Sequence, residues 1–190
     1  MSIFEAAQFL VLASVIVWIL PPIRHYKSYM FDFFLILALV DPITLIYGMI
    51  TSKSLPMWII ALFVYLLIIS VISEEYLKKM KYLFIALPIL LISLIPFLQT
   101  THYHFAIMFE MSVLLFIFLK WLITNYVDNK KLKIFYLMLV FYILTVILKY
   151  FNLLIGFADA SQFFVITSIT QILFGLYFSV AREDGSGIAH

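Results

Sequence analysis

The sequence predicts an all-α integral membrane protein, folded as a compact bundle of seven transmembrane helices, and three observations lead to this prediction. Of the 190 residues, 66% are hydrophobic and 12% are charged, whereas soluble domains contain about 45 to 50% apolar residues. The apolar residues form seven runs, each near the length of about 20 helical residues that crosses a bilayer. The polar breaks between runs are too short to form a folded domain outside the membrane.

One membrane domain is expected over residues 1–184, and the end of the chain at 185–190 is interpreted as a linker and tag remnant. The first run lacks the basic start and the small-residue cleavage site of a signal peptide before Pro21–Pro22, so it counts as a spanning helix. The seven expected spans are 3–20, 28–50, 57–73, 82–98, 105–126, 134–156 and 162–181.

The second span contains an Asp41–Pro42 step in an otherwise apolar run. Pro42 has no N–H group and its ring clashes with the carbonyl group of Ala38, which predicts a bend in the helix. Asp41 then lies near the middle of the membrane, where an ionised carboxylate is costly unless it is paired, protonated or hydrated. The acid either has a purely structural role at the bend or marks a functional site.

The third and fourth spans hold few polar residues, so we expect them to be scaffold or lipid-facing helices. In the fifth span Glu110 lies about 7 Å from the outer end, and in the sixth Lys149 lies about 10 Å from it, at about 1.5 Å per residue. An ion pair between Glu110 and Lys149 would satisfy both charges. Such a pair could either tie two helices together or line a ligand site.

Polar residues share one face of the sixth span at i, i+3, i+7 and i+10, and similar residues follow in the outer half of the seventh. This pattern predicts an outward-facing polar pocket between the second, fifth, sixth and seventh spans. The alternative is that the same groups satisfy one another in separate helix pairs. The residues expected to bind a ligand are Asp41, Glu110, Tyr142, Thr145, Lys149, Asn152, Thr170 and Gln171.

The distribution of Lys and Arg predicts the orientation. Nine of these residues border one set of span ends, whereas only Lys53 lies on the opposite side. Positively charged loops stay in the cytoplasm. We therefore expect a multi-pass protein of the plasma (cytoplasmic) membrane, with its N-terminus outside and its C-terminus in the cytoplasm.

Composition and motifs exclude several classes of function. The net charge of +2 does not suggest nucleic acid, cysteine is absent, and no P-loop, G-x-G-x-x-G or G-x-S-x-G motif occurs. No cofactor is expected. A metal held by His102 and His104 would need Glu110 or Asp159 as its third ligand, so no metal site is expected. Three alternatives remain: a sensor, receptor or accessory subunit that binds a small molecule or lipid and acts on a separate signalling partner; a proton-coupled small-solute transporter using Asp41; and an intramembrane lipid-modifying enzyme using Asp41 or Glu110.

Overall fold

A computed structural model describes residues 3–183, apart from the side chains of residues 3–8, Leu91, Ala160 and Ser161. The segment 185–190, interpreted above as a linker and tag remnant, lies outside the described residues. The described chain is helical almost throughout. Its elements are α1 (Ile3–Trp18), α2 (Leu20–Arg24), α3 (Phe31–Thr51), α4 (Met57–Val71), α5 (Glu74–Lys79), α6 (Lys81–Ser93), the 3-10 turn η1 (Ile95–Phe97), α7 (Thr100–Asn129), α8 (Ile134–Ile155) and α9 (Ala160–Val180).

Four of these helices, α3, α7, α8 and α9, are long and apolar enough to cross a membrane. The chain is therefore a multi-pass membrane protein by helix length and composition. The other three expected spans also fall on helices, but these are shorter or interrupted. The first span is divided into α1 and α2, and the fourth is divided into α6 and η1.

Three prolines lie within or at the start of helices. Pro21 and Pro22 do not end the first span as expected, because they occupy the first turn of α2, where an N–H group would have no helical partner in any case. Pro42 lies inside α3, which continues on both sides of it from Phe31 to Thr51. Close to this point the Thr44 hydroxyl donates a hydrogen bond to the carbonyl oxygen of Val40, at 2.8 Å.

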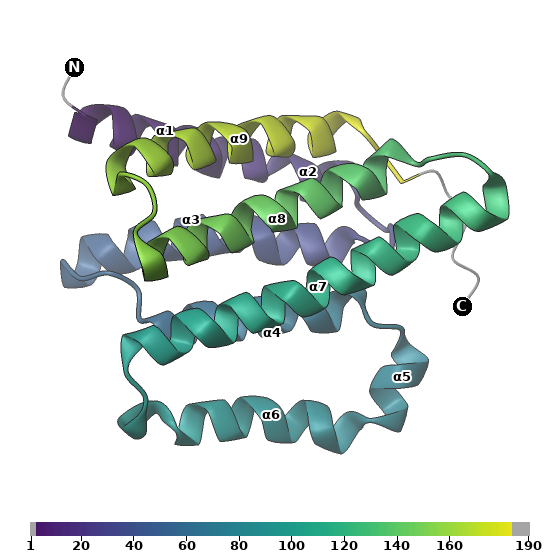
Figure 1. Cartoon of the computed structure of the whole chain (residues 1–190), viewed down its shortest axis with the longest axis horizontal. Helices are drawn as coiled ribbons and strands as arrows, with labels where there is room; N and C mark the ends of the chain where they lie inside the picture. The colour runs from purple at the N-terminus through teal and green to yellow at the C-terminus, as the bar shows by residue number, and fades with distance from the viewer. Residues whose placement is uncertain (1–2, 184–190) are drawn as a thin grey trace.

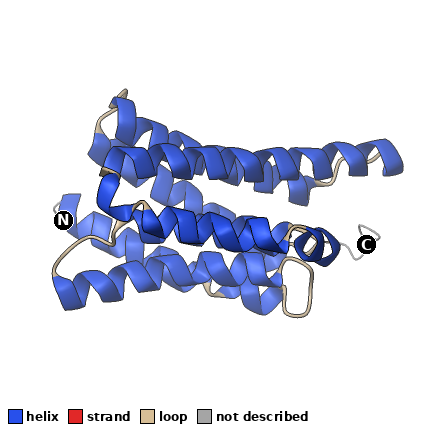
Figure 2. Ribbon diagram, turned by 90° about the horizontal axis from the view of Figure 1, so that it is seen from below, coloured by secondary structure: helices blue, strands red, loops and turns tan. Residues whose placement is uncertain are grey.

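Six helices form a closed ring. Figure 1 shows α7, α8 and α9 in front of α1, α3 and α4, and Figure 2 shows the same two layers from below. Each helix packs against the next one around the ring, in the order α1, α3, α4, α7, α8, α9 and back to α1. Helix α6 lies outside this ring and packs against α4. The space between the two layers is thus enclosed by helices far apart in the sequence.

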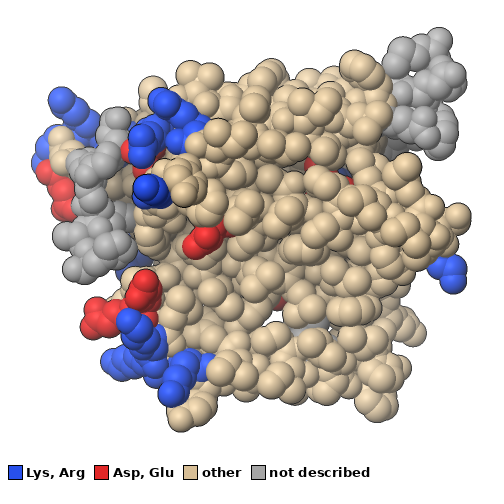
Figure 3. Space-filling model, turned by 180° about the vertical axis from the view of Figure 1, so that it is seen from behind, with Lys and Arg blue, Asp and Glu red and all other residues tan. Residues whose placement is uncertain are grey.

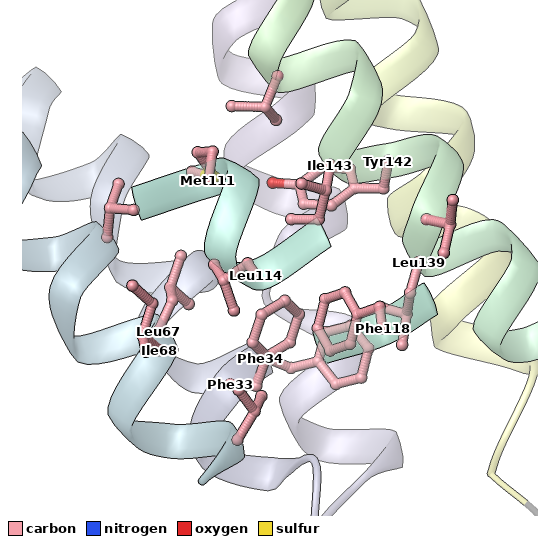
Figure 4. Packing of buried hydrophobic residues seen from close by; sticks show 14 of the residues in the cluster. Phe33, Phe34, Leu67, Ile68, Met111, Leu114, Phe118, Leu139, Tyr142 and Ile143 are labelled. Atoms are coloured by element: carbon pink, nitrogen blue, oxygen red, sulfur yellow. The ribbon is translucent and has the colours of Figure 1, made fainter. Parts of the chain in front are cut away.

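One half of this enclosed space is filled by an aromatic cluster, defined here as Phe33, Phe34, Phe118, Phe135 and Phe178. All five side chains are buried, and the centroids of neighbouring rings are 5.1 to 6.4 Å apart, within the range that aromatic pairs prefer. The cluster joins α3, α7, α8 and α9, and Figure 4 shows the rings of Phe33, Phe34 and Phe118, from α3 and α7, close together. It closes the bundle near the starts of α3 and α8 and the end of α9.

The same end of the bundle is the basic one. Figure 3 shows Lys and Arg gathered at one end, while the lateral surface is almost free of charge. Helix α7 has 30 residues, so it is about 45 Å long and exceeds the hydrocarbon thickness of about 30 Å. Its C-terminal turns therefore project towards the basic end, beyond the length that a bilayer core requires.

Candidate functional site

The half of the ring that the aromatic cluster leaves open contains a cavity of about 210 Å³. All six ring helices contribute side chains to its wall, and α6 contributes none. Most of the wall is apolar, with a small group of charged and polar residues on α3, α8 and α9. The lining residues are Trp18, Leu37, Val40, Asp41, Thr44, Ile60, Phe63, Val64, Leu67, Met111, Tyr142, Val146, Lys149, Tyr150 and Gln171.

Asp41 brings an acid to this wall from the middle of α3. Its Oδ2 accepts a hydrogen bond from the hydroxyl group of Ser14 in α1, at 3.1 Å. Ser14 is buried, whereas Asp41 is partly exposed. The hydrogen bond fixes one carboxylate oxygen against α1, and the carboxyl group as a whole remains at the surface of the cavity.

Lys149 brings the opposite charge from α8. Its Nζ lies 5.6 Å from the centroid of the Phe164 ring in α9, within the range of a cation–π contact. The charges of Asp41 and Lys149 attract each other electrostatically. They do so across the cavity, because no ion-pair contact joins these two described residues. Lys149 therefore faces an acid to which it is not bonded.

Two tyrosines and a glutamine add polar groups near these charges. Tyr142 is buried and packs its ring on Trp18 at 5.1 Å and on Phe174 at 5.7 Å, so it separates the cavity from the aromatic cluster. Tyr150 lies at the other side of Lys149 along α8, and its ring centroid is 6.0 Å from that of His104 in α7. In Figure 4 the hydroxyl group of Tyr142 lies apart from the rings of Phe33, Phe34 and Phe118. The wall can therefore donate and accept hydrogen bonds as well as carry charge.

The structure brings together four of the eight residues expected to bind a ligand. Asp41, Tyr142, Lys149 and Gln171 line one cavity, although they come from three helices. Their role in ligand binding stays a prediction. The sequence predicts a pocket between the second, fifth, sixth and seventh spans, and the cavity is lined by residues from all four, although the fifth span contributes only the apolar Met111.

The other four residues lie elsewhere, and three of them bond to nearby backbone. The hydroxyl group of Thr145 donates to the carbonyl oxygen of Phe141, and that of Thr170 donates to Ile166, at 2.9 and 2.8 Å. Such bonds to the preceding turn are common for Ser and Thr inside helices. Asn152 is buried and its Oδ1 accepts a hydrogen bond from the backbone N–H group of Ala158, which holds the loop after α8.

The fourth residue, Glu110, does not form the expected ion pair with Lys149. These two described residues make no such contact. The charge that acts electrostatically on Lys149 is that of Asp41. Glu110 instead acts electrostatically on Tyr65 of α4, and its Oε2 is buried without a hydrogen-bond partner among the described residues. Glu110 lies on a side of α7 that does not line the cavity. The next residue, Met111, lines the cavity instead.

Several contributors to the site were not predicted from the sequence. Ser14, Thr44 and Tyr150 were not singled out, and the third span was treated as scaffold or lipid-facing surface. Helix α4 in fact supplies Ile60, Phe63, Val64 and Leu67 to the cavity wall. Tyr150 directly follows Lys149 in the sequence and could have been noticed there. Ser14 and the apolar residues of α4 give no signal without the structure, because many similar residues face lipid.

The histidine pair serves the start of α7. His102 is exposed, and its Nδ1 accepts a hydrogen bond from the backbone N–H group of Gln99 at 3.1 Å, so it caps the helix. His104 packs against Tyr150. In the part of the chain that the structure describes, no group of three His, Asp or Glu side chains is arranged to hold a metal ion.

At the basic end, two titratable groups hold the C-terminal part of the chain against the turn before α3. His25 is fully buried and its Nε2 lies 3.2 Å from the carbonyl oxygen of Phe178. Burial lowers the pKa of His25 below 6.5 and raises the pKa of Glu183 above 4.5. The carboxylate of Glu183 also accepts hydrogen bonds from the backbone of Met30 and Tyr29. These contacts close the basic end below the aromatic cluster.

No protein-family model, curated protein sequence or solved structure matches the chain.

Proposed function

We propose that this protein is a small membrane sensor, receptor or accessory subunit that binds a small polar molecule in the cavity of the six-helix ring. The observation that carries the proposal is that all six ring helices line one cavity in which an acid and a base are not in direct contact. Cavities that are mostly apolar with a few convergent polar groups are typical of ligand sites. A ligand there touches helices that are far apart in the sequence.

The proposed membrane arrangement has seven spans, with the N-terminus outside and the cavity in the outer half. Its support is the alignment of α1, α4 and α6 with the four long helices in Figures 1 and 2, together with the concentration of Lys and Arg at one end in Figure 3. Positive charge at the cytoplasmic end follows the usual rule for membrane proteins. Under this arrangement the aromatic cluster separates the cavity from the cytoplasm.

The proposed mechanism is a shift between two arrangements of the ring. A ligand can move such an equilibrium only by binding one arrangement more tightly than the other. Asp41 belongs to one layer of the ring, and Lys149 and Gln171 belong to the other. A ligand that contacts both layers therefore changes their relative position, and a separate signalling partner at the basic end would read that change.

The test is a binding screen on the purified chain in detergent or nanodiscs, with amino acids, betaines, short amines, short acids, sugars and polyols as probes. We expect at least one probe to raise the unfolding temperature and to bind in calorimetry. Lys149→Met and Gln171→Leu should weaken that binding at least tenfold. The matched controls Lys120→Met and Gln162→Leu, which alter exposed residues, should not. Absence of any binding probe, or equal loss in the controls, would contradict the proposal.

A second function, proton-coupled transport of a small solute, is favoured by one observation. Asp41 lies beside Pro42 inside a long apolar helix, and the hydroxyl group of Ser14 is its hydrogen-bond partner. Acids in such positions often carry protons in transporters. In proteoliposomes with an acidic exterior, Asp41→Asn should abolish uptake of the bound solute, whereas Asp32→Asn, at an exposed acid of the same helix, should not. Binding without uptake would leave the sensor as the function.

The lipid-modifying enzyme has less support. Glu110 does not line the cavity, so of the two candidate acids, Asp41 or Glu110, only Asp41 faces that space. Formation of a product by the solubilised protein without any gradient would be the result that favours this alternative over the other two.

A further inference from the structure

We propose that the cavity ligand is a small zwitterion whose cationic group lies near Asp41 and whose acidic group lies near Lys149. This inference rests on the proposed function, because it names the ligand class of the same cavity. Three features of the cavity carry it: the two opposite charges, the volume, and the composition of the wall around each charge.

The first feature is the pair of opposite charges in the cavity wall. Asp41 and Lys149 line the same cavity from opposite layers of the ring, yet they form no ion pair. A separated charge in a low-dielectric site is costly, and removing its partner from a buried pair is strongly destabilising. A cation alone would satisfy Asp41 and leave Lys149 unpaired, and an anion alone would do the reverse. A zwitterion satisfies both groups at once.

The volume sets an upper limit on the ligand. The cavity measures about 210 Å³, and a cavity of about 150 Å³ is known to hold one benzene molecule. The available space therefore suits a ligand of about six to ten heavy atoms. This is the size of a small amino acid or betaine, and it is far too small for a complete lipid.

The wall offers contacts for both charged groups of such a ligand. Asp41 shares the wall with the aromatic rings of Trp18, Tyr142 and Tyr150, which can hold an ammonium group by cation–π attraction in addition to its pairing with the acid. The amide of Gln171 lies in the wall as well and can donate to an acidic group beside the Lys149 amine. Both a primary ammonium and a quaternary ammonium group fit this description, so the shared chemistry is a compact zwitterion.

The experiment uses five probes of similar size on the full chain in nanodiscs: valine and glycine betaine as zwitterions, choline as the cation, butyrate as the anion, and N-methylacetamide as the neutral solute. Calorimetry should show that one of the zwitterions binds at least tenfold more tightly than choline, butyrate and the neutral solute. Valine against glycine betaine then separates a primary from a quaternary ammonium group. This comparison needs only the wild-type protein, so it does not depend on whether variants fold.

Two variants then test the assignment of each charge. Asp41→Asn should reverse the preference towards butyrate, and Lys149→Met should reverse it towards choline, because each change leaves one charge unmatched. Asp32→Asn and Lys120→Met are the matched controls and should keep the preference for the zwitterion. Crossed preferences of this kind are not produced by a general loss of stability.

The outcomes separate the two proposals. If the neutral solute, choline or butyrate binds as tightly as the zwitterions, the ligand class is wrong and the cavity remains a binding site. If variant preferences do not cross, the assignment of the two charges is wrong. If no small solute of any class binds, both the ligand class and the proposed function fail.

Discussion

Stability should fall as the pH falls below neutrality, because one histidine must be neutral in the folded protein. His25 follows α2 and is fully buried, with its ring centroid 4.5 Å from that of Phe34 and 5.5 Å from that of Phe135. Its Nε2 must carry the proton, since the carbonyl oxygen of Phe178 can only accept a hydrogen bond. Its Nδ1 has no hydrogen-bond partner among the described residues. A second proton would place a charge among phenylalanine rings.

The sign and the size of this change in stability follow from the linkage between protonation and folding. Burial, and to a lesser degree the nearby charges of Arg182 and Arg24, lower the pKa of His25 below 6.5 in the folded state. Between the lowered pKa and 6.5 the unfolded chain binds more protons, so the stabilising contribution is present above pH 6.5 and is lost as the pH falls. One proton is worth about 1.4 kcal/mol per pH unit. The free energy of unfolding should therefore drop by up to about 1.4 kcal/mol between pH 7.5 and pH 5.5.

The assay is equilibrium unfolding in mixed detergent micelles from pH 5 to pH 8, for the wild type and for His25→Gln. Glutamine can still donate to the carbonyl oxygen of Phe178 but does not titrate. Other groups titrate in both proteins, including Glu183, whose raised pKa has the opposite effect. The difference between the two proteins isolates His25. A difference that does not change with pH, or a wild type that gains stability over the variant in acid, would refute the reasoning.

Three further predictions concern packing and can be checked by the same unfolding assay. Phe178→Ala should lower the free energy of unfolding by about 3 kcal/mol, because this fully buried ring joins four helices, whereas Phe116→Ala, at a ring that is 72% exposed, should change it by less than about 0.5 kcal/mol. Gly175→Ala should lower it by about 1 to 2 kcal/mol, since the new Cβ would lie 2.7 Å from Cγ1 of Val17; an unchanged or higher value would show that α1 and α9 can separate freely. Glu110→Leu should raise it by about 1 kcal/mol, because it removes a buried carboxylate oxygen without a partner; a loss of stability would mean that the acid is bonded in the membrane.

Much of the fold was predictable because a bilayer restricts the possible structures. A spanning segment must satisfy its own backbone hydrogen bonds, so an apolar run of sufficient length reads directly as a helix. This is why all seven expected spans fall on helices. The interruption of the first span was not predictable in detail, because whether Pro21 and Pro22 end one helix or begin another depends on how the next turn packs.

The depth of each candidate site residue in the membrane was predictable, but the side of its helix that faces the other helices was not. Rise per residue gives the depth of Asp41, Lys149 and Glu110 along their helices. The side of the bundle that each one faces depends on which helices are neighbours, and sequence does not state this. Helices α7 and α8 do pack together, yet Glu110 acts electrostatically on Tyr65 of α4 and Lys149 is attracted by Asp41 of α3, so the expected Glu110–Lys149 ion pair does not form.

The closure of the ring explains how a site in one half of the bundle can affect the other half. The cavity and the aromatic cluster are both built on α3, α8 and α9, and Tyr142 contacts both. Packed aromatic rings transmit displacement because a close-packed core resists compression. Under the proposed function, a ligand that draws Asp41 towards Lys149 would displace Tyr142 and the rings of the aromatic cluster. Through Phe178 it would also shift the carbonyl group that His25 contacts. Under the proposed function, the turn before α3 and Glu183 are then the parts of the basic end on which a partner would detect an occupied cavity.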